Sequence, residues 1–185
     1  MMDKPINPWP VPVALEDVPE TGLHVELEAP AAVRAALAPL GGLRDLPELS
    51  VAFDVTRRGS GLRVVGRVKG RVGQTCVVTL EPIENAIDEE IDLLFSPDAP
   101  VVPEGGEGGH HQTVGHTADE EDAPEPLVGG GIDLGAIATE FLMLGIDPYP
   151  RKPGAEFAAP ARDTETEHPF AALAALKKSS GDGGR

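Results

Sequence analysis

The sequence has 185 residues, a formal net charge of −16 and a single cysteine, Cys76. The charge argues against a protein that coats a phosphate backbone, and one cysteine excludes an internal disulfide and fits a reducing compartment. Gly and Pro together exceed a fifth of the chain, so part of it is expected to lie outside any packed core. The sequence has no apolar run long enough for a membrane span. A small cytoplasmic protein with one domain is therefore expected.

The first third of the chain predicts an extended lead, one strand and one helix. Residues 1–12 contain four prolines and no continuous apolar segment, which argues against a secretory signal. Alternation of apolar and polar residues over Leu23–Leu27 predicts a strand. A helix is predicted to follow Pro30 and to stop at Gly41 and Gly42. Its apolar stripe consists of Val33, Leu37 and Leu40.

Residues 49–95 predict an antiparallel β-sheet. Alternation along Leu49–Val55 indicates one strand, and a turn at Arg58–Gly61 leads into a return strand whose even-numbered residues, 62 to 72, are apolar or glycine. A third strand is predicted over Thr75–Leu80 and a fourth over Ile87–Phe95. Gaps this short favour antiparallel pairing, because parallel strands need long crossovers.

The second half predicts a disordered acidic insertion and two helices. Residues 97–131 are rich in Gly, Pro and carboxylates and have no apolar periodicity. One helix is predicted from the N-cap Asp133 to Leu144, and a short one from Pro169 to Lys178, before a disordered tail at 179–185. The predicted fold class is α+β: an antiparallel meander of four to six strands packed with two or three short helices. A single domain over residues 13–178, insertion included, is expected.

Positive charge is concentrated on one face of the return strand. From Val55 to Leu80 the chain has six cations and no carboxylate, whereas the stretch from Val72 to Pro150 has 17 carboxylates and no cation. The candidate RNA-binding residues are Arg57, Arg58, Arg63, Arg67, Lys69 and Arg71. The alternative is that these cations pair across strands with Asp88, Glu90 and Asp92. No aromatic residue alternates with them, so a stacking platform for single strands is not supported.

The sequence contains no recognisable catalytic or metal-binding motif. His110, His111 and His116 match no rigid ligand set, and Cys76 lies in an apolar run that predicts a buried packing cysteine. The glycines at 129–131 lack the lysine of a phosphate-binding loop. We therefore expect no enzyme, no cofactor, no metal and no small-molecule substrate. The rival hypothesis is a metal-dependent nuclease that uses Glu89, Glu90 and Asp92.

Four stretches together resemble the YceD family of large ribosomal RNA subunit accumulation proteins. They are the glycine-spaced strand Leu62–Val68, the segment Cys76–Ile83, the segment Ile132–Pro150, and the C-terminal His168–Leu173, which is similar to an Asn-Pro-Phe-x-x-Leu ending. The second segment departs from the family's Cys-x-Arg-Cys-Leu-x-Pro-like pattern, since Val78 and Thr79 replace its arginine and second cysteine. Members with additional cysteines look like zinc binders, but this chain has none, so no metal is carried over.

The resemblance implies a bacterial protein with a part in the synthesis, processing or stability of 23S ribosomal RNA, and it implies no catalytic activity. The expected partner is a large-subunit rRNA precursor, contacted through the basic strand face, or a basic ribosomal or RNA-processing protein, attracted by the acidic surface. A general acidic adaptor unrelated to ribosomes is a further alternative.

Overall fold

The computed structural model describes residues 7–100 and 123–157. The chain divides into two units, Met1–Ala155 and Glu156–Arg185, and all the elements below belong to the first. The second unit lies almost entirely outside the described residues, as do the short helix predicted after Pro169 and the tail predicted at 179–185.

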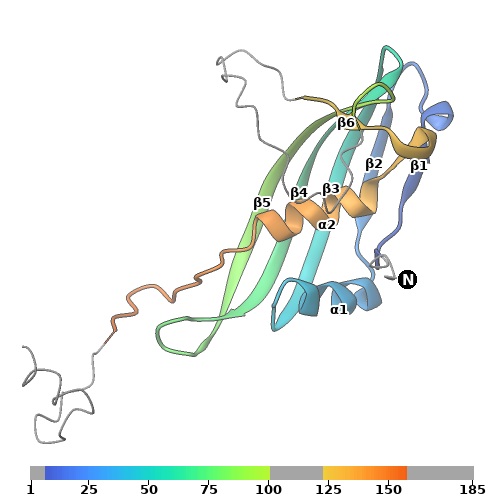
Figure 1. The fold of residues 1–185 in the computed structure, drawn as a ribbon. Coiled ribbons are helices and arrows are strands. Elements are labelled where there is room, and N and C mark those ends of the chain that lie inside the picture. Colours follow the sequence, from blue (N-terminus) through green and yellow to red (C-terminus); the bar gives the residue numbers. More distant parts are fainter. Residues whose placement is uncertain (1–6, 101–122, 158–185) are drawn as a thin grey trace, which may run out of the picture. The chain divides into compact units, whose positions relative to one another are not determined.

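A five-stranded sheet forms the framework of the first unit (Figure 1). Its strands lie in the order β2-β3-β4-β5-β6, and all neighbours are antiparallel except β5 and β6, which are parallel. The strands are β2 (Leu23–Glu28), β3 (Asp45–Arg58), β4 (Gly61–Thr75), β5 (Pro82–Ser96) and β6 (Glu125–Pro126). A separate two-stranded sheet pairs β1 (Pro12–Ala14) with β7 (Gly131–Asp133).

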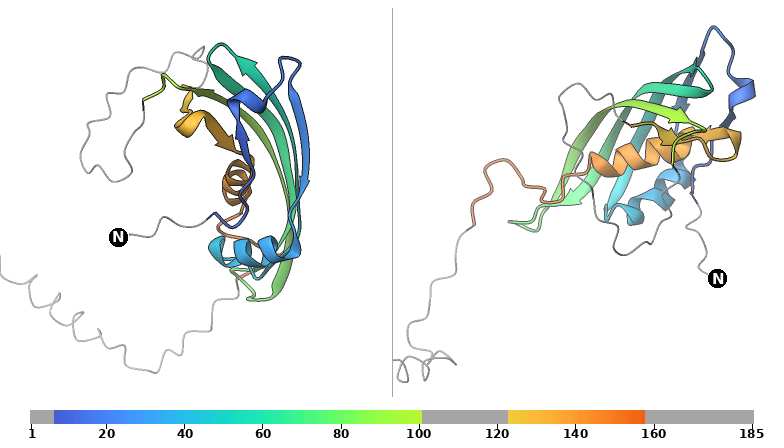
Figure 2. Two further views of the ribbon diagram at one scale, coloured as in Figure 1. Left: turned by 90° about the vertical axis from the view of Figure 1, so that its right-hand side faces the viewer. Right: turned by 45° about the horizontal axis from the view of Figure 1, so that its top comes forward.

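Both α-helices lie on the concave side of the curved sheet (Figure 2). Helix α1 (Ala31–Leu40) contacts β3, and helix α2 (Leu134–Leu144) contacts β4 and β5. Two 3₁₀ turns, η1 (Leu15–Asp17) and η2 (Val128–Gly130), complete the described elements. No described helix is both long enough and apolar enough to cross a membrane.

The core lies between the concave face of the sheet and helix α2. Leu62, Val64 and Val68 of β4 are fully buried there, together with Phe53 of β3. These side chains alternate with polar ones because successive residues of a strand point to opposite faces. Helix α2 contributes Leu134, Ala138 and Leu142, all fully buried. The predicted α+β class, with its antiparallel meander, is confirmed.

The strand predicted over Thr75–Leu80 is wrong. β4 ends at Thr75, and the next residues form the loop that joins β4 to β5. The loop closes through hydrogen bonds from the Cys76 N–H to the Glu81 carbonyl and from the Leu80 N–H to the Cys76 carbonyl, both of 2.9 Å. Leu80 has a φ of 59°, in the left-handed region that a β-strand cannot accommodate.

The disordered insertion predicted over residues 97–131 is wrong at both of its ends. Residues 97–100 and 123–131 are described, and they contain β6, η2 and the first residue of β7. The Leu127 N–H donates to the Ser96 carbonyl at 2.9 Å, and the Leu127 side chain packs against the core. Residues 101–122 lie outside the described part of the chain.

The predicted apolar stripe of helix α1 is correct except at its C-terminal end. Helix α1 stops at Gly41, as expected, but Leu40 is 66% exposed and only Leu37 and Ala38 are buried. Leu37 and Ala38 of the same turn stay in the core, so the last turn of α1 is buried on one side and exposes Leu40 on the other.

The Asp133 carboxylate joins the N-terminal segment to helix α2. It caps the helix as predicted, with Oδ1 accepting from the N–H groups of Gly135 at 3.0 Å and Ala136 at 3.2 Å. The same oxygen accepts from the Val11 N–H at 2.8 Å, and Oδ2 accepts from Asn7 Nδ2 at 3.0 Å. The described part of the N-terminal lead, residues 7–12, is therefore held against α2.

We predict that Asp133→Ala lowers the free energy of unfolding by about 2–3 kcal/mol, the sum of a lost cap and of a backbone N–H left without a partner. Asp133→Asn keeps an acceptor for the helix N–H groups and should cost less than half of that. Urea denaturation followed by circular dichroism measures both values. Equal losses in the two variants would contradict the capping role.

Candidate functional site

The face of the sheet that points away from the helices carries the charged residues, and we call it the polar sheet face. Register brings the odd-numbered side chains of β4 beside the even-numbered ones of β3 and β5, so that Arg67 pairs with Ala52 on one side and Glu90 on the other. The polar sheet face comprises Glu48, Arg63, Arg67, Lys69, Arg71, Glu84, Asp88, Glu90 and Asp92.

Three arginines of this face hold five carboxylates. Arg63 binds Asp92 through two hydrogen bonds, Nε to Oδ1 at 2.9 Å and Nη2 to Oδ2 at 2.7 Å. The other ion pairs are Arg67 with Asp88, Arg67 with Glu90 at 3.4 Å, Arg71 with Glu48, and Arg71 with Glu84 at 3.5 Å. The cross-strand pairing with Asp88, Glu90 and Asp92 that the sequence offered as an alternative is thus formed.

The ion pairs keep both partners charged. The hydrogen bond from Arg63 lowers the pKa of Asp92, and the hydrogen bond from Arg67 lowers the pKa of Asp88. The three arginine side chains are nevertheless 41–49% exposed, so each pair contributes little to stability. The guanidinium groups are therefore fixed in position and still accessible from solvent.

The remaining predicted cations lie in three different settings. Lys69 is on the polar sheet face opposite Asp88, and its charge contributes to the lowered pKa of that carboxyl group. Arg58 is exposed at the β3–β4 turn. Arg57 points to the other face, where Nε donates to the Val18 carbonyl at 2.6 Å and Nη2 to the Glu16 carbonyl at 3.2 Å. The structure thus separates Arg57 from the other candidates.

A shallow depression lies on the same side of the sheet and includes two of the candidate cations, Arg67 and Lys69. It measures about 580 Å³ and lies over β2, β3 and β4. Arg67, Lys69 and Ser50 line it from the centre of the sheet, and Glu26 and Glu28 line it from β2.

The acidic residues proposed for a nuclease do not form a cluster. Glu90 and Asp92 lie on the polar sheet face, whereas Glu89, one residue out of phase, points to the other side. A β-carbon added to Gly145, which ends α2, would lie 2.9 Å from Glu89 Oε1. Over residues 7–100 and 123–157, no group of three or more metal-ligating side chains is close enough to hold an ion.

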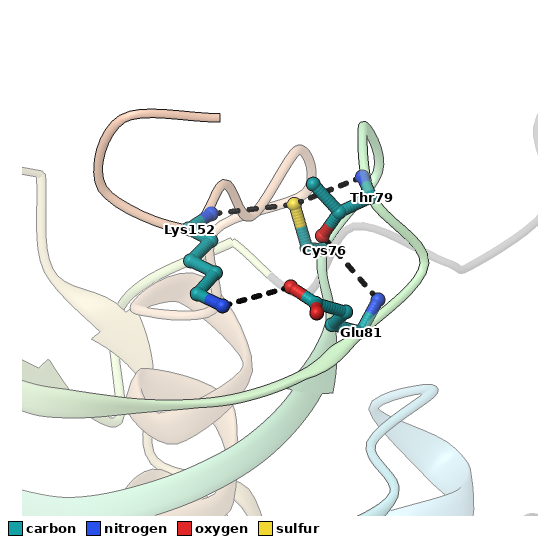
Figure 3. A network of polar contacts seen from close by, with 4 residues as sticks. All are labelled: Cys76, Thr79, Glu81 and Lys152. Carbon is teal, nitrogen blue, oxygen red and sulfur yellow. Dashed lines mark hydrogen bonds and ion pairs between the residues drawn. The ribbon is translucent and has the colours of Figure 1, made fainter. Parts of the chain in front are cut away.

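A second polar group surrounds Cys76 in the β4–β5 loop (Figure 3). The Cys76 side chain is fully buried, as predicted, but it lies in a turn and not in a strand. Its Sγ accepts hydrogen bonds from the backbone N–H groups of Lys152 at 3.3 Å and Thr79 at 3.4 Å. The Lys152 Nζ binds Glu81 Oε2 at 2.8 Å. Sequence inspection missed Lys152, since 76 residues separate it from Cys76 and no local pattern links them.

These hydrogen bonds favour the thiolate form of Cys76. The Lys152 N–H is the largest cause, the hydrogen bonds from Thr79 add to it, and together they overcome burial and lower the pKa to about 6. The turn also places residue 79 directly beside residue 76, although the side chain there is a threonine.

A family model described as "Large ribosomal RNA subunit accumulation protein YceD" matches residues 64–177, more than half of the chain. The chain belongs to the YceD family. The matched part includes most of β4, all of β5, the Cys76 loop and α2, whereas β1, β2, α1 and β3 precede it. No curated protein and no solved structure matches the chain.

We predict that His24, on the same face at β2, titrates above its ordinary pKa of 6.5, because Nδ1 lies 2.7 Å from Asp54 Oδ1. A raised pKa means that this pair adds stability fully below the ordinary value and loses it as the pH rises through the folded value. NMR titration of the His24 ring should show the shift, and Asp54→Asn should remove most of it, since Glu26 at 3.7 Å supplies the smaller remainder. An unchanged pKa in that variant would contradict the pairing.

We further predict that Cys76 is half ionised near pH 6 in the folded YceD-family chain. Because the folded pKa is depressed, the stabilisation is complete above the unfolded value near 9 and is lost as the pH falls through about 6. Thiolate absorbance, with Cys76→Ser as the blank, measures the midpoint. Lys152→Pro removes the donating N–H and should raise the midpoint by at least one unit. Lys152→Ala keeps that N–H and should change it little, so equal effects would contradict the assignment.

Proposed function

We propose that this protein is a non-catalytic ribosome-biogenesis factor that supports the synthesis, processing or stability of large-subunit ribosomal RNA. Membership of the YceD family is the observation that carries the proposal, since the family description names the accumulation of that RNA and no reaction. The finer question is which molecule binds directly.

The first candidate for the direct partner is the rRNA precursor. Arg63, Arg67, Lys69 and Arg71 project from alternate positions of one strand and are accessible on the polar sheet face. Lys69 and Arg67 line the same shallow depression, where a phosphate would meet two cations that share the carboxylate of Asp88. Arg58 at the turn would extend this surface, whereas Arg57 already donates to the carbonyls of Glu16 and Val18.

The second candidate for the direct partner is a basic ribosomal or RNA-processing protein. The balance of charges on the polar sheet face favours it. The five carboxylates that the arginines hold outnumber the four cations of the polar sheet face. An RNA phosphate would have to displace or share these carboxylates, while a basic side chain would add to them. We therefore propose a basic protein as the direct partner, with RNA contact limited to Lys69 and its neighbours.

Two rival functions predict other results. A metal-dependent nuclease would cleave RNA with purified protein and would lose that activity when Glu89, Glu90 and Asp92 are changed. An acidic adaptor unrelated to ribosomes would recover no ribosomal component.

The test is affinity purification of the tagged protein from its native cell, with both RNA and protein identified. We expect ribosomal or RNA-processing proteins with large-subunit rRNA precursor, and we expect nuclease treatment to remove the RNA but leave the proteins. Recovery of no ribosomal component would contradict the proposed function.

A variant pair separates the two partner chemistries. Replacement of Arg63, Arg67, Lys69 and Arg71 by Ala removes the basic row, and a matched variant that also converts Glu48, Asp88 and Asp92 to their amides prevents an excess of unpaired carboxylates. Loss of the precursor RNA from both folded variants, with the proteins retained, would identify the basic row as an RNA contact. If both variants retain the precursor RNA as well as the proteins, a basic protein is the direct partner.

A further inference from the structure

Strand β5 has an outer edge that is open along most of its length. β5 spans Pro82–Ser96, but its outer neighbour β6 pairs only with Phe95 and Ser96. Within the described residues, no other strand pairs with that edge. Figure 1 shows β5 as the long outermost strand, with β6 across one end.

The register shows which backbone groups the open edge presents. Pairing between β4 and β5 is continuous from Leu62 with Phe95 to Thr75 with Pro82, without a bulge. The Phe95 carbonyl lies against Gly61 of β4, whereas the Ser96 carbonyl accepts from Leu127 beyond the outer edge. Both backbone groups of a residue point the same way and the direction alternates, so the even-numbered residues of β5 direct theirs outward. They are Glu84, Ala86, Asp88, Glu90, Asp92 and Leu94.

Negative charge is the main protection of this edge against strand addition. Natural edges are blocked by charged side chains, most often lysine, by prolines within the strand, by bulges or by a covering element. β5 has no lysine and no bulge, and its only proline, Pro82, is its first residue. Four of the six outward residues are carboxylates instead, with side chains 50–81% exposed.

Charge decides which strand this edge can accept. A second copy of β5 would place carboxylates against carboxylates, so pairing between two copies is disfavoured. An added strand with Lys or Arg at alternate positions would place each cation on the polar sheet face, beside Glu84, Asp88, Glu90 and Asp92. Glu84 and Glu90 are the most available of these, because they lie 3.5 and 3.4 Å from their arginines and the closer contacts are made by other carboxylates.

We propose that the outer edge of β5 binds an extended basic segment of a partner protein as an additional strand. Backbone hydrogen bonds to the outward groups set its position, and the carboxylates select alternating cations. The proposal rests on the proposed function only for the ribosomal class of that partner. The docking mode itself depends on the strand edge alone.

The direct test is amide hydrogen exchange by NMR on the full chain, with and without a ten-residue peptide of alternating Lys and Thr. In the free protein the amides of Ala86, Asp88, Glu90 and Asp92 should exchange fast, and those of Ile87, Glu89 and Ile91 slowly. Peptide binding should slow the first set at least tenfold and leave the second set unchanged. A peptide of alternating Glu and Thr should have no effect.

Two variants test the backbone and the charge separately. Ala86→Pro removes one outward N–H without touching the β4 pairing, and it should weaken the peptide about tenfold. Its matched control is Glu26→Pro in β2, at the other edge of the sheet. The Ala29 N–H donates to Leu49 of β3, so by alternation the odd-numbered residues of this segment point toward β3 and the Glu26 N–H points outward. That control should bind normally. Glu84→Gln with Glu90→Gln should weaken binding several-fold at low salt and less at high salt.

Four outcomes would overturn the edge proposal, and three of them concern the peptide experiments. These three are slow exchange of the even-numbered β5 amides in the free protein, peptide binding that protects none of them, and equal weakening by Glu26→Pro. Binding of an RNA oligonucleotide instead of the peptide would do the same. None of these outcomes bears on whether the native protein copurifies with ribosomal components, so failure of the edge and failure of the proposed function can be told apart.

Discussion

The register of β4 between β3 and β5 determines both surfaces of the sheet at once. Its even-numbered residues form the buried side under α2, and its odd-numbered residues form the polar sheet face. A slip of one residue would exchange the two sets and bury Arg67 and Lys69 in place of Val64 and Val68. Because burying an unpaired charge is so costly, the core enforces the arrangement of the charged surface.

The polar sheet face has fixed cations without a net positive charge. Each arginine is oriented by one close carboxylate, and two of them have a second carboxylate nearby. Such a surface distinguishes partners by the spacing of their charges more than by the sign of their net charge. A partner gains only where its own charges fit between those already paired, which makes non-specific attachment to nucleic acid weak and favours partners with a regular spacing.

Local sequence patterns were sufficient to predict the long elements. Period-two alternation located β3, β4 and β5, and the N-cap Asp133 with Gly145 located α2, because each signal lies within the element itself. The β4–β5 loop was misassigned, since Cys76–Leu80 has the composition of a strand and its conformation depends on contacts with the distant residues Pro150 and Lys152. The candidate site was predicted in part. Alternation placed most of the cations on one face, but it could not show that Arg57 donates to the carbonyls of Glu16 and Val18.

The only tryptophan of the chain is Trp9, and it is buried beside the start of α2 rather than within the five-stranded sheet. A β-carbon at Gly135 would lie 1.7 Å from the Trp9 carbonyl oxygen, so the segment and the helix are in direct backbone contact. Intrinsic fluorescence of this protein therefore reports on attachment of the N-terminal segment. An emission change without a change in the circular dichroism of the strands would signal release of that segment while the sheet stays folded.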